Sequence, residues 1–167
     1  VRFGALTLFV CHLKAPYPDQ NRATKIRGLE AQAIRRVIEN SFKHPAEHLW
    51  MILGDLNTPV GVDAGKDVAL RPLLDDFGID LMARMPEAEA WTYVMPDTGE
   101  HLRPDGMLAS PALANRAKHA APGIERRGMD STATHGASYP LSEVGSPRPH
   151  ASDHAAIWID LPDSVFA

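Results

Sequence analysis

Leu49 to Asn57 reads LWMILGDLN. Its first five residues are apolar without interruption, which is typical of a short strand that is buried on both faces of a sheet. The run then meets Gly54 and Asp55, so the strand is expected to end there and to open into a loop. Asp55 and Asn57 are two residues apart and would project to the same side of an extended chain. This stretch predicts an α/β fold with polar groups at the end of a buried strand.

Strands and helices are expected on both sides of this stretch. Residues 3–10 form another apolar run, which leads to His12 just before a proline-containing loop. From Arg22 to Asn40, apolar residues recur every three or four positions with charged residues between them, which predicts an amphipathic helix. The apolar face of that helix is expected to consist of Ile26, Leu29, Ala33, Ile34, Val37 and Ile38.

The second half of the chain predicts shorter elements, because its apolar runs are brief and are separated by Gly, Pro and Asp. The expected elements are a helix capped by Asp67 and stopped by Gly78, a hairpin with strands at 90–95 and 103–109, a long surface loop over 117–150 with a strand near Ile124, and a final strand at 155–161.

The composition bounds the class of protein. A chain of 167 residues with 44% hydrophobic content fits one domain, 1–167, with a sizeable core. No apolar stretch approaches the roughly 20 residues of a membrane helix, and a net charge of −4 excludes a strongly basic surface overall. The single cysteine, Cys11, cannot form an internal disulfide, which favours the cytoplasm over secretion. Because the chain begins at Val1 without Met, we expect it to be processed, excised or incomplete.

Three polar motifs lie at expected strand ends and suit the cleavage of a phosphodiester. They are Gly54–Asn57, Arg103–Asp105 and Ser152–His154. A phosphodiester repels its nucleophile, so a catalyst must neutralise charge, generate hydroxide and stabilise the departing oxygen. Singly, such residues are more often turn formers, caps or solvated strand ends. Their shared position at strand ends is what favours a common site.

The polar side chains have candidate roles that follow from their chemistry. The carboxylates of Asp55 and Asp153, with Asp105 as a third candidate, could hold Mg²⁺, which prefers oxygen ligands. His154 can accept a proton from water near neutral pH, and Asp105 on its other ring nitrogen would fix the tautomer. Asn57 can donate to a phosphoryl oxygen without adding negative charge. The candidate catalytic residues are His12, Asp55, Asn57, Asp105 and His154.

The same motifs, in the same order, resemble the second half of the endonuclease/exonuclease/phosphatase superfamily. Its members include pancreatic deoxyribonuclease, abasic-site endonucleases, inositol polyphosphate phosphatases and neutral sphingomyelinases. The resemblance spans residues 3–161, and it implies a four-layer αββα sandwich. This chain would cover mainly the second half of that fold, a mixed sheet with helices on one face. The matching segments are Cys11–Lys14, Ile52–Asn57, Arg103–Pro111 and Ser152–His154.

The resemblance also implies roles for the site residues. Asp55 and Asn57 would bind and polarise the scissile phosphate, and His12 would contact it. His154 would contact the phosphate or act as general base, with Asp105 orienting its ring. Asp55 stays a second candidate for activating the attacking water.

A further implication is that part of the site is missing. Family members begin with an additional half-domain that carries an Asn and a Glu, and this Glu is a principal metal ligand. Asp153 would share Mg²⁺ or Mn²⁺ with it, whereas no Glu follows a strand before His12 in this chain. A lone half would expose the inner face of its sheet. We therefore expect the missing half to be supplied by another chain or by self-association, or the chain to be a rearranged or weakened version.

The sequence thus predicts a metal-dependent phosphodiesterase of nuclease type, acting on a phosphodiester substrate such as nucleic acid. Two alternatives stay open. One is a phosphatase-like or sphingomyelinase-like member of the same family, and the other is a noncatalytic remnant that binds phosphate or a partner. The resemblance implies that loops distinguish the substrates within the family. The predicted loop over 117–150 contains no recognisable substrate-binding motif, so the sequence does not specify the substrate.

Overall fold

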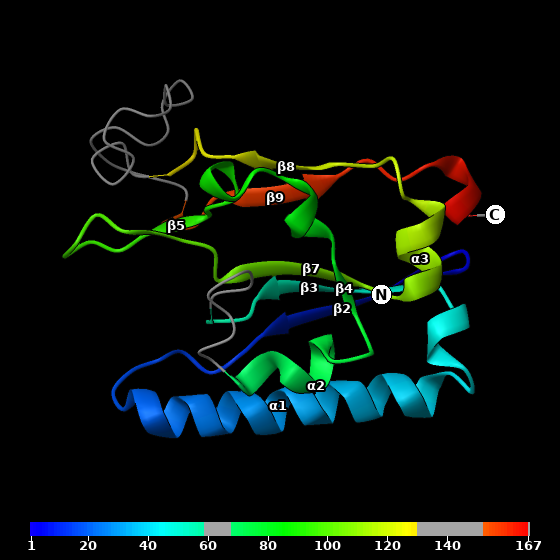
Figure 1. Cartoon of the computed structure of the whole chain (residues 1–167), viewed down its shortest axis with the longest axis horizontal. Helices are drawn as coiled ribbons and strands as arrows, with labels where there is room; N and C mark the ends of the chain where they lie inside the picture. Colours follow the sequence, from blue (N-terminus) through cyan, green and yellow to red (C-terminus); the bar gives the residue numbers. More distant parts are fainter. Residues whose placement is uncertain (59–67, 130–151, 167) are drawn as a thin grey trace.

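The computed structural model describes residues 1–58, 68–129 and 152–166. A mixed five-stranded sheet lies at its centre, between a helical layer and a smaller β layer (Figure 1). The second and third strands in spatial order run parallel, and the other neighbouring pairs are antiparallel. In that order the strands are β1 (Arg2–Phe3), β2 (Leu6–His12), β3 (Trp50–Asp55), β7 (Asp105–Ala109) and β4 (Ile79–Asp80).

The helical layer covers one face of this sheet. It consists of α1 (Gln20–Ser41), the short 3₁₀ turn η3 (Val68–Leu70) and α2 (Arg71–Leu74). Asp19 caps α1, because its carboxylate accepts a hydrogen bond from the backbone N–H of Arg22. Trp50 and Ile52 of β3 belong to the core on this side and are fully buried. The helix predicted over 22–40 is confirmed.

The predicted apolar face of α1 is partly wrong. Ile38 is completely buried, but Leu29 and Val37 are 65% and 52% exposed. The buried side chains of the helix are Ala23, Arg27, Ala31 and Ile38. Small residues at the contact let α1 lie close to η3 and α2, so the buried face is rotated away from the larger aliphatic side chains.

The opposite face of the sheet is covered by a two-stranded ribbon of β8 (Pro122–Glu125) and β9 (Ala156–Ile159), by η4 (Leu81–Arg84) and by α3 (Pro111–Arg116). Met51 and Met107 of the sheet are only 1% and 2% exposed beneath this layer. The expectation that a lone half would expose its inner sheet face is therefore wrong for these positions. It holds at the end of β2, where Val10 is 72% exposed.

The predicted hairpin also needs correction. Its strands are β5 (Tyr93–Val94) and β6 (His101–Leu102), which pair with each other. The segment expected as the second hairpin strand instead forms β7, which pairs with β3 and β4 in the main sheet. All five residues of β7 are buried, so this strand needs cover on both faces, which a two-stranded hairpin does not provide.

Several remaining predictions are confirmed in type and differ in length. The helix before Gly78 is short, since α2 has four residues, and its expected cap Asp67 lies outside the described residues. Strand β8 contains Ile124 as expected, β9 lies within 155–161, and most of the predicted loop 117–150 lies outside the described residues. No helix in the described part of the chain is long and apolar enough to cross a membrane. The described residues also form the 3₁₀ turns η1 (Pro45–Glu47), η5 (Glu87–Glu89) and η6 (Asp163–Val165).

Two substitutions in α1 test the rotated face of the helix. We expect Ile38→Ala to lower the free energy of unfolding by about 2–5 kcal/mol, because it leaves a cavity against the sheet. Leu29→Ala should change it by less than about 0.5 kcal/mol, since the side chain already faces solvent. Urea denaturation followed by circular dichroism measures both. Equal losses of stability would show that the buried face is wrongly placed.

Candidate active site

The register of the central sheet brings three polar side chains into one row. His12 of β2 is the register partner of Asp55 of β3, and Asp55 is the register partner of Asp105 of β7. Partners across neighbouring strands project to the same face. The row lies where β2 and β3 end, on the same face as the buried Met51 and Met107. Three residues that are far apart in the sequence therefore meet at one end of the sheet.

Gly54 permits the close approach of β2 and β3 at this end of the sheet. Its φ is +133°, and a Cβ atom at this position would lie 2.0 Å from the carbonyl oxygen of Cys11. Both the backbone conformation and the space therefore require glycine. The glycine in the Gly-Asp pair of the sequence has a specific structural cause, because it brings Asp55 beside the end of β2.

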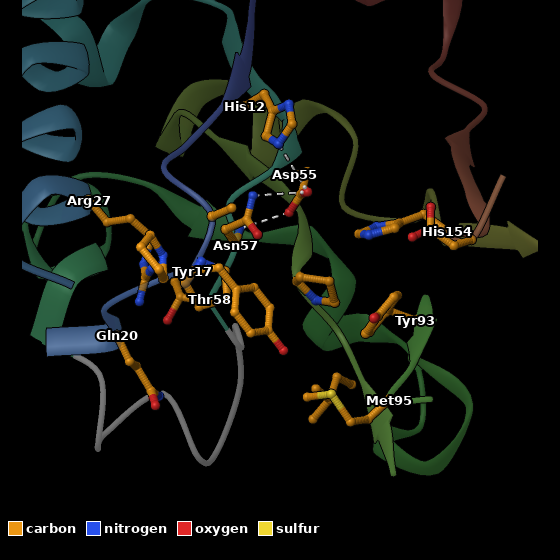
Figure 2. Close-up of a pocket in the computed structure, with 16 residues that line it drawn as sticks. His12, Tyr17, Gln20, Arg27, Asp55, Asn57, Thr58, Tyr93, Met95 and His154 are labelled. Carbon is orange, nitrogen blue, oxygen red and sulfur yellow. Dashed lines mark hydrogen bonds and ion pairs between the residues drawn. The ribbon is translucent and has the colours of Figure 1, made fainter. Parts of the chain in front are cut away.

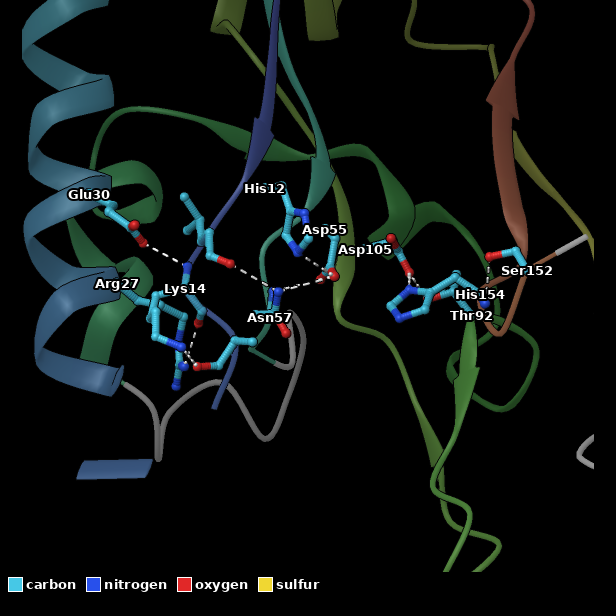
Figure 3. A network of polar contacts seen from close by, with 12 residues as sticks. His12, Lys14, Arg27, Glu30, Asp55, Asn57, Thr92, Asp105, Ser152 and His154 are labelled. Atoms are coloured by element: carbon cyan, nitrogen blue, oxygen red, sulfur yellow. Dashed lines mark hydrogen bonds and ion pairs between the residues drawn. The ribbon is translucent and has the colours of Figure 1, made fainter. Parts of the chain in front are cut away.

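Asn57 holds the Asp55 carboxylate in place. The backbone N–H of Asn57 donates to Asp55 Oδ1 at 2.8 Å, and its Nδ2 donates to Asp55 Oδ2 and to the carbonyl of Leu13, both at 3.0 Å (Figure 3). The two Nδ2 protons are thus engaged in this arrangement, and donation to a phosphate would require one of these bonds to be exchanged. His12 Nε2 lies 3.5 Å from Asp55 Oδ2.

Partial burial changes the acidity of Asp55. Desolvation raises the pKa of its carboxyl most strongly, and the charge of Asp105 raises it further. The hydrogen bond from the Asn57 backbone and the positive charges of His154 and His12 act in the opposite direction, but the net shift is upward. Asp55 is therefore a better proton acceptor than a solvated aspartate.

Asp105 and His154 form the second part of the site. His154 Nδ1 lies 2.8 Å from Asp105 Oδ2, and the hydroxyl of Thr92 donates to the same oxygen at 2.6 Å. Asp105 is 8% exposed, so these two partners satisfy a buried carboxylate. The hydrogen bond to Asp105 is the main cause of a raised pKa of His154, with help from the negative charges of Asp105, Asp55 and Asp153, while burial lowers it. This is the pairing that the sequence predicted.

The backbone around His154 is fixed from both sides. Its N–H donates to Ser152 Oγ at 3.0 Å, and the residue forms a β-bridge with Tyr93. The rings of Tyr93 and His154 also pack together, with centroids 4.9 Å apart. Sequence reasoning missed Thr92 and Tyr93. The only available signal was a polar residue within the apolar run of 90–95.

The predicted site residues line one cleft of about 790 Å³ (Figure 2). Its lining includes His12, Asp55, Asn57, Asp153 and His154. Asp105 lies behind His154 and reaches the cleft through it. The structure thus brings all the residues predicted from sequence to one place.

The described residues fit a divalent cation only in part. One ligand atom from each of Asp55, Asp105 and His154 lies within 4.8 Å of the others, but His154 Nδ1 and Asp105 Oδ2 are already bonded to each other. Mg²⁺ prefers oxygen ligands in an octahedral arrangement. Among the described lining residues, the carboxylates are those of Asp55 and the exposed Asp153, so water or substrate oxygens would complete the coordination.

Comparison with solved structures places the fold. The chain is similar to an AP endonuclease from Archaeoglobus fulgidus with a TM-score of 0.62 and 13% sequence identity, over 93% of this chain and 61% of that one. At this identity the likeness concerns the fold, and the expected mixed α/β fold class is confirmed. The chain spans about three fifths of the length of its structural neighbour. Neither a protein-family model nor a curated protein sequence matches it.

The Asp105–His154 pair predicts a specific titration. In Asp105→Asn the pKa of His154 should fall, because the main interaction that favours the imidazolium is lost. NMR titration of the His154 ring measures this, with Asp163→Asn in η6 as a charge-matched control that should leave it unchanged. Since the folded pKa lies above the unfolded one, the pair stabilises the fold fully below the ordinary histidine pKa. That contribution is lost as pH rises through the folded pKa. An unchanged His154 titration in Asp105→Asn would contradict the pairing.

Proposed function

We propose that this chain carries the catalytic residues of a metal-dependent phosphodiesterase of nuclease type. The observation that carries the proposal is the His154–Asp105 pair at 2.8 Å on one cleft with the oriented carboxylate of Asp55. A paired imidazole and a separate carboxylate supply a proton acceptor and a ligand for a hard cation, the two needs of phosphodiester hydrolysis. The fold shared with an AP endonuclease supports the same reaction class.

In this mechanism His154 is the general base. Asp105 holds Nδ1, so Nε2 is the ring nitrogen that takes a proton from the attacking water, and the buried carboxylate stabilises the imidazolium that forms. Asp55 is the second candidate for this role, because its pKa is also raised. His12, whose side chain is 73% exposed, donates to a phosphate oxygen. Asn57 keeps Asp55 oriented toward the cleft.

Asp55 and Asp153 are the residues that would hold Mg²⁺ or Mn²⁺. The bound ion would supply neutralisation of phosphate charge and a more acidic water. Two carboxylates with several waters and substrate oxygens are a common environment for Mg²⁺. A further ligand would come from another polypeptide that covers the exposed end of β2 around Val10 and His12.

A second function follows if Asp55 and Asp153 are the only metal ligands of the chain. A chain that retains the phosphate-contacting groups but holds its cation weakly would bind a phosphate or a phosphorylated partner without cleaving it. His12 and His154 would supply the contacts, and Asn57 would add one by exchanging a bond to Leu13 or Asp55. The two functions differ in turnover, which the next experiment measures.

We expect hydrolysis of a model phosphodiester such as bis(p-nitrophenyl) phosphate to require Mg²⁺ or Mn²⁺. His154→Ala should lower kcat by at least about a hundredfold, because the proton acceptor is removed, and Asp55→Ala should abolish turnover. Asp163→Ala serves as the control, since this exposed residue lies outside the cleft. Parent-rate cleavage by Asp55→Ala would sink the assignment, whereas no turnover by any form of the chain would favour the noncatalytic binding function.

With only Asp55 and Asp153 as candidate metal ligands among the described residues, the isolated chain is expected to bind metal weakly. Isothermal titration calorimetry with Mg²⁺ should show no saturable binding in the micromolar range, and Asp153→Asn should weaken what binding there is. Circular dichroism of the same samples checks that the fold is unchanged. Tight stoichiometric binding would mean that a ligand other than Asp55 and Asp153 completes the site.

A further inference from the structure

The cleft continues beyond the polar centre into an aromatic and apolar part that the proposed mechanism does not use. Tyr17, Tyr93, Met95, Leu102 and Pro104 line this part. Figure 2 shows Tyr17 and Tyr93 projecting into the cleft from opposite sides, with Asp55 beyond them. Below, these side chains are called the aromatic part of the cleft. A flat group placed here would lie next to a phosphate bound at Asp55 and His154.

Tyr17 is held in an exposed position. Its side chain is 72% exposed, although the loop that carries it is fixed: Lys14 Nζ donates to the carbonyls of Ala15 and Tyr17 at 3.0 and 2.7 Å. Asp19 then anchors the chain as the cap of α1. Because the loop backbone is already anchored, a ligand that stacks on this ring does not have to order the loop first. The loop therefore presents Tyr17 ready for contact.

Tyr93 links the aromatic part to the catalytic pair. Its ring packs on the ring of His154, and its strand forms a β-bridge with the same residue. Burial is the main cause of a raised pKa of the Tyr93 hydroxyl, and the charges of Asp153, Tyr17 and Asp97 raise it further, so the hydroxyl stays a hydrogen-bond donor at neutral pH. A ligand ring between Tyr17 and Tyr93 would be positioned directly relative to His154.

The charges of the cleft indicate how a substrate is recognised. Among the described residues that line it, Arg27 is the only Arg or Lys, and this side chain is 2% exposed and donates to the Lys14 carbonyl and to Thr24. Asp55 and Asp153 add negative charge. Proteins that bind a nucleic-acid duplex take most of their affinity from rows of Lys and Arg along the phosphates. No such row lies among the described lining residues, whereas two tyrosines do, and base stacking on aromatic rings is the other main source of affinity for nucleic acids.

We propose that Tyr17 and Tyr93 hold an unpaired nucleobase beside the scissile phosphate. The inference rests on the proposed phosphodiesterase function and specifies its substrate as a single-stranded or short nucleotide phosphodiester. A volume of about 790 Å³ is within the range of cofactor-sized sites. The amide of Gln20, at the far end of the cleft (Figure 2), offers the donor and acceptor that a base edge requires.

Calorimetric binding of two probes tests the base contact without requiring turnover. Adenosine 5′-monophosphate and ribose 5-phosphate share a phosphate and a sugar and differ in the base. We expect the nucleotide to bind at least about tenfold more tightly, since base stacking on an aromatic ring has this magnitude. Tyr17→Ala should remove the preference and Tyr17→Phe should retain it. Phe3→Ala is the matched control, because Phe3 is an aromatic residue that is 51% exposed beside the opposite end of β2. Equal binding of both probes, or an unchanged preference in Tyr17→Ala, would overturn the proposal.

Cleavage assays separate this proposal from the proposed function. With Mn²⁺ present, a single-stranded oligonucleotide should be cleaved faster than the same strand in a duplex, and Tyr17→Ala should reduce this difference. Faster cleavage of the duplex, or cleavage of sphingomyelin vesicles in preference to either nucleic acid, would overturn the nucleobase site. A Tyr17-dependent base preference in binding, with no cleavage of any substrate, would support the base contact and overturn the phosphodiesterase.

Discussion

The candidate site depends on the pairing register of β2, β3 and β7. Because His12, Asp55 and Asp105 are register partners, the backbone hydrogen bonds of the sheet determine which side chains meet. A shift by one residue in either pair would turn the row to the other face, toward the core beneath α1. Gly54 maintains this register where β2 and β3 end, since no other residue allows the two strands to approach so closely there.

The carboxylate of Asp105 is buried beside the cleft and depends on its hydrogen-bond partners. A buried charge without partners is strongly unfavourable, and here Thr92 and His154 both bond to one carboxylate oxygen. The same arrangement raises the pKa of His154 and fixes its ring. The contacts that compensate the buried carboxylate are also those that raise the pKa of His154, so a change to Asp105 should affect both stability and the titration of His154.

The layer of β8 and β9 explains how the chain buries most of its sheet. Met51 and Met107 pack under it, so the inner face is covered for much of its area. At the end of β2, Val10 remains 72% exposed, two residues before His12, which lines the cleft. This strand end is therefore the part of the inner face that the described residues leave uncovered.

Local sequence determined the strand at 49–53, the long helix and the candidate residues, because apolar periodicity and turn-forming residues act over short distances. It misplaced the buried face of α1, since Leu29 and Val37 are larger than the alanines that contact α2 and η3. The choice depends on how closely two elements can approach, which no local pattern contains. Sequence order also suggested that the strand at 103–109 completes a hairpin, whereas complete burial places β7 inside the main sheet. Only the tertiary structure decided that Thr92 and Tyr93 contact the Asp105–His154 pair and that Tyr17 and Tyr93 line the same cleft, because this depends on where distant strands and loops come together.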